Sequence, residues 1–148
     1  MIVRNIIVTC FICSFSFSAF AEQIHPTGAS LDLQEKCAKQ AREQFKNDGW
    51  GDQKMAGYTS HYNDKLNKCF VWILATTVDN ATGNITTSQI LEDAFEGKVF
   101  GNYIWVSDKV KKYWEVPPQE CDMILITGEK KNCVSSDEFD ELANYYMQ

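Results

Sequence analysis

The stretch YTSHYNDKLNKCFVWILATT, Tyr58 to Thr77, decides the fold of this chain. Its second half, Lys68 to Thr77, is an apolar run that follows a turn-forming segment, Asn63 to Asn67, so the stretch predicts a β-hairpin. Alternate residues of a strand point to opposite faces, and here both faces are apolar: Cys69, Val71, Ile73 and Ala75 on one, Phe70, Trp72 and Leu74 on the other. Such a strand belongs in the middle of a sheet that is covered on both sides.

The first 21 residues have the three parts of a secretory signal peptide. Arg4 supplies the positive charge, Ile6 to Phe17 is the apolar segment, and Ala19-Phe20-Ala21 fits the cleavage site. The apolar segment is too short to cross a bilayer comfortably, and no later run is apolar enough. We expect residues 1–21 to be a signal peptide and residues 22–148 to be a single periplasmic or secreted domain without a membrane span.

The chain is acidic, with 20 Asp and Glu residues, 14 Lys and Arg residues and a net charge of −6. Removal of the signal peptide takes away Arg4 and no acidic residue, which makes the mature chain more negative. A negative surface repels phosphate backbones, so nucleic acid is not an expected partner.

Cysteine usage indicates disulfides. Two of the six cysteines leave with the signal peptide, and four remain: Cys37, Cys69, Cys121 and Cys133. An even number of cysteines in an oxidising compartment predicts two disulfides, for which three pairings are open. We favour Cys37–Cys69, because helix and inner strand pack face to face, and Cys121–Cys133, because a hairpin brings the two together.

Two amphipathic helices flank the strands. The first is expected from Leu31 to Asn47, with Gly49 ending it, because apolar residues recur every fourth position at Leu33, Cys37, Ala41 and Phe45. The second begins after Ser135, which forms a capping box with Glu138, and buries the stripe Phe139, Leu142, Ala143 and Tyr146.

The remaining strands complete an antiparallel sheet. Thr86 to Leu91 suits a strand, although the spacing of Ile90, Leu91, Ala94 and Phe95 also suits a short helix; we favour the strand. Lys98 to Val106 is a clear strand, and Gln119 to Ile126 forms a hairpin with Glu129 to Val134. Gly128 in the left-handed position of its loop places Cys121 opposite Cys133. The sequence predicts an α+β domain: an antiparallel sheet of five or six strands, an N-terminal helix, a C-terminal helix and two disulfides.

No catalytic constellation is expected. Ser60, His61 and Asp64 are close in sequence, but adjacent strand residues point to opposite faces, so Ser60 and His61 do not easily share a proton. A small hydrolase using His61 with Asp64 or a distant carboxylate is the alternative. The cysteines are too widely spaced for a metal site, and the acidic turns lack calcium-loop spacing, so neither metal nor cofactor is expected.

Aromatic residues supply the candidate ligand-binding surface. Tyr103, Trp105 and Trp114 lie close together in sequence, and such side chains often anchor interfaces. Packing in the core is the favoured explanation for them. With His61, these three residues are the candidate ligand-binding set.

Four blocks carry a resemblance to a known family. CAKQAREQF (37–45), YTSHYNDKLNKCF (58–70), LEDAFEGKVFGNYIW (91–105) and KKYWEVPPQECD (111–122) resemble a family of small exported bacterial proteins of unknown function, and SHYN-x-KLNKCF is the most distinctive part. The resemblance covers about Leu33 to Tyr146. It implies a bacterial envelope location and paired cysteines, and it brings no catalytic residues.

The sequence as a whole favours a non-catalytic binding protein of the bacterial cell envelope. Its expected partner is another envelope protein or a small ligand.

Overall fold

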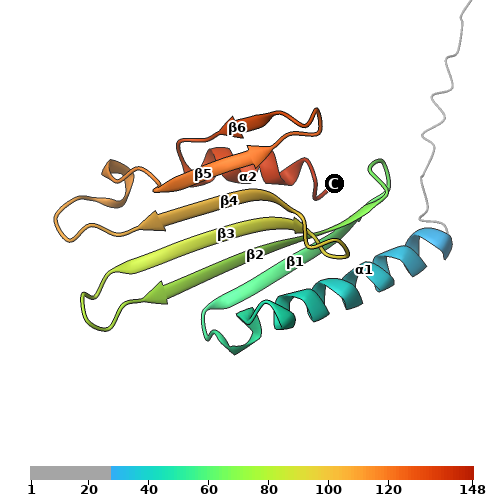
Figure 1. Ribbon diagram of the computed structural model, residues 1–148, viewed down its shortest axis with the longest axis horizontal. Coiled ribbons are helices and arrows are strands. Elements are labelled where there is room, and N and C mark those ends of the chain that lie inside the picture. Colours follow the sequence, from blue (N-terminus) through green and yellow to red (C-terminus); the bar gives the residue numbers. More distant parts are fainter. Residues whose placement is uncertain (1–27) are drawn as a thin grey trace, which may run out of the picture.

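The computed structural model describes residues 28–148, and the expected signal peptide lies outside the described residues. Its helices are α1 (Gly28–Asn47) and α2 (Ser136–Asn144), with 3-10 turns at Trp50–Asp52 and Tyr113–Glu115. Its strands are β1 (Ala56–Asn63), β2 (Lys68–Val78), β3 (Ile85–Asp93), β4 (Val99–Val106), β5 (Glu120–Ile124) and β6 (Lys130–Asn132). The six strands form one antiparallel sheet in chain order (Figure 1). The predicted α+β class, with two helices and two disulfides, is confirmed.

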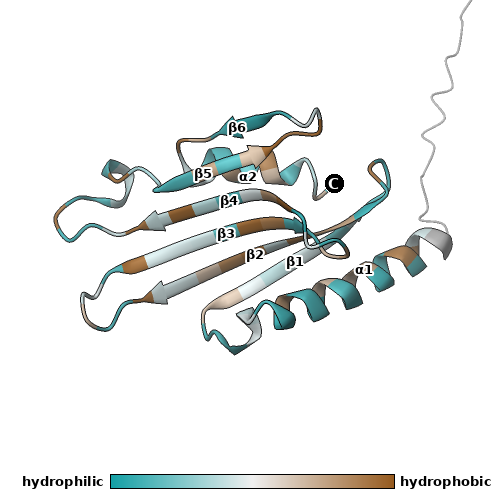
Figure 2. Ribbon diagram, viewed as in Figure 1, coloured by the Kyte–Doolittle hydropathy of each residue, from teal (hydrophilic) through white to brown (hydrophobic). Residues whose placement is uncertain are grey.

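The helices lie on opposite faces of the sheet and at opposite ends of it. On the α1 face, Cys69, Val71 and Ile73 of β2 form one buried cluster with α1. On the α2 face, Phe70 forms a second cluster with α2 and with β4 and β5. Because α1 lies along β1 and α2 lies along β4 and β5, each helix leaves part of its face uncovered (Figure 1). Figure 2 shows the outward side of α1 and strand β6 as mostly hydrophilic.

The first disulfide fastens α1 to β2. Cys37 and Cys69 are both buried and bonded, with their Cα atoms 5.4 Å apart. Beside them, the Gln34 side chain donates to the carbonyl oxygen of Tyr62 at 3.1 Å and accepts from its N–H at 3.2 Å. These two bonds occupy backbone groups of Tyr62 on the open edge of β1 and protect that edge from pairing with another chain.

The second disulfide closes the β5–β6 hairpin. Cys133 N–H donates to the carbonyl oxygen of Cys121 at 2.9 Å, and the two residues are bonded with Cα atoms 5.0 Å apart. Gly128 has φ +84°, the left-handed conformation from which this register was predicted. Ser135 then starts α2 by accepting a hydrogen bond from Glu138 N–H, while the Glu138 carboxylate accepts from Val134 N–H. The capping box is therefore half formed, with the second bond one residue earlier than predicted.

The turn between β1 and β2 is held by side chains of the SHYN-x-KLNKCF block. Asn63 is buried, donates to the carbonyl oxygen of Tyr146 and accepts from Leu66 N–H. Asn67 has φ +51°, and its side chain accepts from the Tyr62 hydroxyl at 2.6 Å. Asn tolerates this left-handed conformation better than most residues do, which explains its place in the turn.

Three details differ from the sequence expectation. Helix α1 begins at Gly28 rather than Leu31, and β3 extends to Asp93, so the helical alternative for this segment is wrong. Strand β2 is an inner strand but lies second from the edge, and its Leu74 is 50% exposed because α2 lies over β4 and β5 instead.

No helix among residues 28–148 has both the length and the apolar character needed to cross a membrane.

Candidate functional site

The uncovered part of the α2 face forms a groove, which we call the Trp72 groove. Its volume is about 620 Å³, within the range typical of small-molecule sites. Strand pairing aligns Gly57 with Leu74 and Thr59 with Trp72, so β1 and β2 build the floor together. The full lining is Met55, Ala56, Gly57, Tyr58, Thr59, Trp72, Leu74, Thr76, Thr87, Gln89, Ser136 and Asp140.

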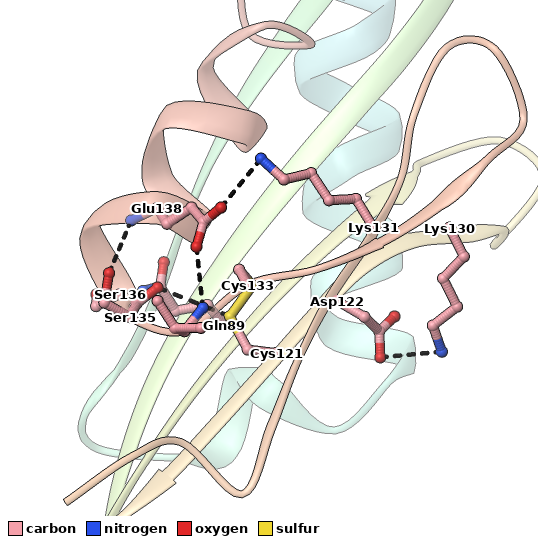
Figure 3. Close-up of a disulfide and its surroundings, with 10 residues drawn as sticks. Gln89, Cys121, Asp122, Lys130, Lys131, Cys133, Ser135, Ser136 and Glu138 are labelled. Carbon is pink, nitrogen blue, oxygen red and sulfur yellow. Dashed lines mark hydrogen bonds and ion pairs between the residues drawn. A yellow bond between two sulfur atoms is a disulfide. The ribbon is translucent and has the colours of Figure 1, made fainter.

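A set of hydrogen-bonded polar side chains closes the groove at the start of α2. Gln89 of β3 is 5% exposed and links the sheet to the helix. Its Oε1 accepts from Trp72 Nε1 at 3.0 Å, and its Nε2 donates to Ser136 Oγ at 3.0 Å. Figure 3 shows Gln89 and Ser136 meeting close to the Cys121–Cys133 disulfide. The tryptophan that forms the apolar floor is thereby fixed in orientation by the polar end.

Asp140 contributes the charged group of the groove. Its carboxylate is hydrogen-bonded by Gln89, yet its Oδ1 is buried and has no hydrogen-bond partner among the described residues. Burial raises the pKa of this carboxyl, the Asp137 charge adds to the rise, and the Gln89 hydrogen bond opposes it. Asp140 lines the groove and is its one charged residue, so its carboxylate is the charged acceptor that a bound molecule would meet there.

The reactive side chains of the lining are the carboxyl of Asp140 and hydroxyls such as that of Ser136. The lining contains no histidine, cysteine, lysine or arginine, the side chains that most often act as bases, nucleophiles or anion-stabilising groups. Within the described chain, no group of three or more His, Cys, Asp or Glu side chains is arranged to hold a metal ion.

Three of the four predicted ligand-binding residues gather in a second hollow, which we call the aromatic pocket. This hollow of about 420 Å³ lies between the Tyr113–Glu115 turn and the start of α2, and it is lined by Tyr103, Trp105 and Trp114 together with Tyr113, Glu115, Val116, Pro117, Pro118, Val134, Ser135, Ser136 and Asp137. Ser136 belongs to both hollows, so they lie on either side of the helix start.

Tyr103 and Trp105 are part of the packed core. Tyr103 is buried. Its burial is the main cause that raises the pKa of its hydroxyl, and a hydrogen bond with Tyr113 adds to the rise. Trp105 is buried, donates to the carbonyl oxygen of Val116 at 3.0 Å and packs on Tyr113 with ring centroids 4.8 Å apart. Trp114 is 74% exposed, and Lys112 Nζ lies over its ring in a cation–π contact, 5.2 Å from the ring centroid.

His61 lies apart from these three residues. It is half-buried on β1, pairs with Phe70 and lines neither hollow. Ser60 pairs with Val71 and points to the opposite face, as expected from strand alternation. Asp64 is exposed in the following turn, and no hydrogen bond within residues 28–148 joins it to His61.

The sequence analysis did not predict a binding role for the residues that line the Trp72 groove. Gln89 and Asp140 are far apart along the chain and meet only because α2 crosses back over the sheet. One signal was available: Ser136 and Asp140 are four residues apart and flank Phe139, so a helix that buries Phe139 brings both of them to the sheet.

Comparisons with protein-family models, with curated proteins and with solved structures give no match to this chain. The geometry of the site is therefore the basis on which a function is assigned.

Proposed function

We propose that this protein is an exported, non-catalytic binding protein of the bacterial cell envelope, and that the Trp72 groove holds a small amphipathic ligand. The observation that carries the proposal is the groove itself, which combines an apolar floor of Trp72 and Leu74 with one charged lining residue, Asp140. Apolar hollows with a few convergent polar groups are the usual form of small-molecule sites.

Two further features support export and binding. Two disulfides are typical of proteins in oxidising compartments such as the periplasm or the extracellular space. Leu74 keeps half of its surface exposed in the floor of the groove, and covering this surface with an apolar ligand removes it from water.

The test of the proposal is a titration with 1-octanol followed by amide NMR. We expect chemical-shift changes confined to groove residues and to the indole N–H of Trp72. Gly57 lines the groove, and a Cβ built on it meets no atom within 4 Å, so a leucine at this position should occupy part of the groove. Gly57→Leu should weaken octanol binding at least tenfold.

The matched control is Thr77→Leu. Thr77 is an exposed residue of β2 that lies outside the groove lining, so this variant places a leucine side chain elsewhere on the hairpin. We expect it to bind octanol like the wild type. Shifts spread over the surface, or binding that Gly57→Leu leaves intact, would overturn the proposal.

The hydrolase alternative is the weaker proposal, because His61 lines neither hollow and forms no hydrogen bond to Asp64 in the described part of the chain. Its test is ester hydrolysis measured against pH. An activity that titrates near neutral pH and disappears in His61→Ala would favour the hydrolase over the binding protein.

A further inference from the structure

We propose that the Trp72 groove selects amphipathic molecules with a protonated amine at one end, and that the carboxylate of Asp140 receives the amine. This inference rests on the proposed function, because it names the chemistry of the ligand for the same groove.

The first argument is that the polar end of the groove offers an acceptor. Two fixed N–H donors at this end are already used, since Trp72 Nε1 donates to Gln89 and Gln89 Nε2 donates to Ser136. Asp140 Oδ1 is left buried and, among the described residues, without a donor. Asp140 lines the groove, so a ligand that supplies an N–H group can gain a charged hydrogen bond from its carboxylate, whereas a ligand carbonyl or carboxylate adds another acceptor beside it.

The second argument is the charge of the groove. Its lining includes the carboxylate of Asp140 and no lysine, arginine or histidine. Asp137 lies about one helical turn before Asp140, and its charge already disfavours ionisation of Asp140. A cation placed between these groups and the apolar floor is attracted, and an anion is repelled. The net charge of −6 favours the approach of cations over anions as well.

The third argument is shape. The apolar floor of Trp72 and Leu74 adjoins the polar end, because Trp72 itself donates to Gln89. An alkyl or aryl body can therefore lie over the floor while its amine reaches Asp140. Both parts of such a molecule meet a matching surface, which neither a purely polar cation nor a neutral hydrocarbon does.

Three probes of equal chain length test the inference: octylamine, 1-octanol and octanoate, each titrated by NMR. We expect octylamine to bind about ten times more tightly than octanol, which corresponds to one well-placed charged hydrogen bond. Octanoate should bind most weakly. Equal affinities for octylamine and octanol would overturn the amine preference but would leave the groove as a ligand site.

The matched variants are Asp140→Asn and Asp137→Asn. Both remove one negative charge from the first turns of α2, but Asp137 is exposed and lines the aromatic pocket instead of the groove. Asp140→Asn should abolish the preference for octylamine and leave octanol binding within twofold. Asp137→Asn should lower octylamine affinity by less than threefold. Equal losses in the two variants would show that only long-range charge acts, and would refute the role of Asp140.

The two proposals fail in different ways. If octanol and octylamine both bind without sensitivity to Gly57→Leu, the groove is not the ligand site and the proposed function fails. If both depend on Gly57 but not on Asp140, the groove binds ligands and only the amine preference fails.

Discussion

Glu92 of β3 and Asp48, the residue after α1, form a carboxyl pair between the sheet and the helix end. Glu92 is 5% exposed, and its Oε1 has no hydrogen-bond donor among the described residues. Burial, followed by the charge of Asp48 and a hydrogen bond to it, raises the pKa of Glu92 to about 7. Gln44 donates to both Asp48 oxygens, at 3.3 and 3.1 Å. Its hydrogen bond with Glu92 opposes the rise in the pKa of Glu92.

Glu92→Gln should change how stability depends on pH. The folded protein holds a proton on Glu92 that the unfolded chain releases at lower pH, so this pair stabilises the fold most in acid and loses its contribution as pH rises towards 7. A glutamine removes that dependence, and at pH 8 the variant should be more stable than the wild type by at most about 3 kcal/mol.

Urea unfolding at pH 5 and pH 8 checks this prediction. The control is Glu96→Gln, an exposed residue near the same β3–β4 turn, which should shift stability equally at both pH values. If the free energy of unfolding changes by the same amount between pH 5 and pH 8 in the wild type and in Glu92→Gln, the pKa of Glu92 is not raised in the folded protein.

The two disulfides should contribute unequally to stability. Cys37–Cys69 closes the longer loop, with a sequence separation of 32 against 12 for Cys121–Cys133. On the chain-entropy account, replacing the first pair with alanine should cost about 4 kcal/mol and the second about 3 kcal/mol. Urea unfolding of the two double variants measures both losses. A larger loss for Cys121→Ala with Cys133→Ala would contradict the loop-length argument.

The fold was predictable where its cause is local. The apolar run of β2 is visible because alternate residues reveal both faces, and the register of Cys121 and Cys133 follows from counting outward from Gly128. The end of β3 was harder to predict. The strand was predicted to end at Leu91, and no local pattern indicates that the next residue, Glu92, is buried beside Asp48 with a raised pKa.

The Trp72 groove was not predictable for a different reason. Leu74 looks like a core residue in sequence, and whether it is covered depends on where α2 crosses the sheet. Tyr103 and Trp105 were candidate ligand-binding residues; the fold buries most of their surface beside α2 and keeps them in the lining of the aromatic pocket. Sequence patterns identify which side chains are apolar, while helix placement decides which of them remain available to a ligand.

Gly101 of β4 is required by the packing of α2 on the sheet. A Cβ at this position would lie 2.5 Å from Met123 Cε and 3.1 Å from a ring atom of Phe139, and both side chains are fully buried. Gly101→Val should therefore destabilise the fold by about 1–3 kcal/mol through overpacking. Thermal unfolding measures the loss.

A second substitution tests whether the clash is the cause. Shortening Met123 to alanine makes room for the valine, so Gly101→Val combined with Met123→Ala should lose less stability than the sum of the two single variants. Strict additivity would mean that the side chains do not compete for the same space. Gly57→Ala, whose new Cβ meets no atom within 4 Å, is the control for replacing a strand glycine.

Asn63 ties the β1–β2 turn to the end of the chain through both halves of its amide. Its Nδ2 donates to the carbonyl oxygen of Tyr146 at 3.2 Å, and its Oδ1 accepts from Leu66 N–H at 3.0 Å. Asn63→Ala leaves both partners unpaired and should cost about 2–3 kcal/mol, with little dependence on pH.

Asn63→Asp distinguishes the contribution of the Nδ2 donor from that of the Oδ1 acceptor. An aspartate keeps the bond from Leu66 N–H, but at neutral pH it places a carboxylate against the carbonyl oxygen of Tyr146, and both are acceptors. In acid the protonated carboxyl can donate to that oxygen, so Asn63→Asp should be more stable relative to wild type at pH 4 than at pH 7. Asn67→Asp is the control, because Asn67 is exposed and uses only its acceptor. Urea unfolding at pH 4 and pH 7 measures the stability of both variants. An equal loss of stability in Asn63→Asp at the two pH values would mean that the Nδ2 donor of Asn63 does not hold the C-terminal segment.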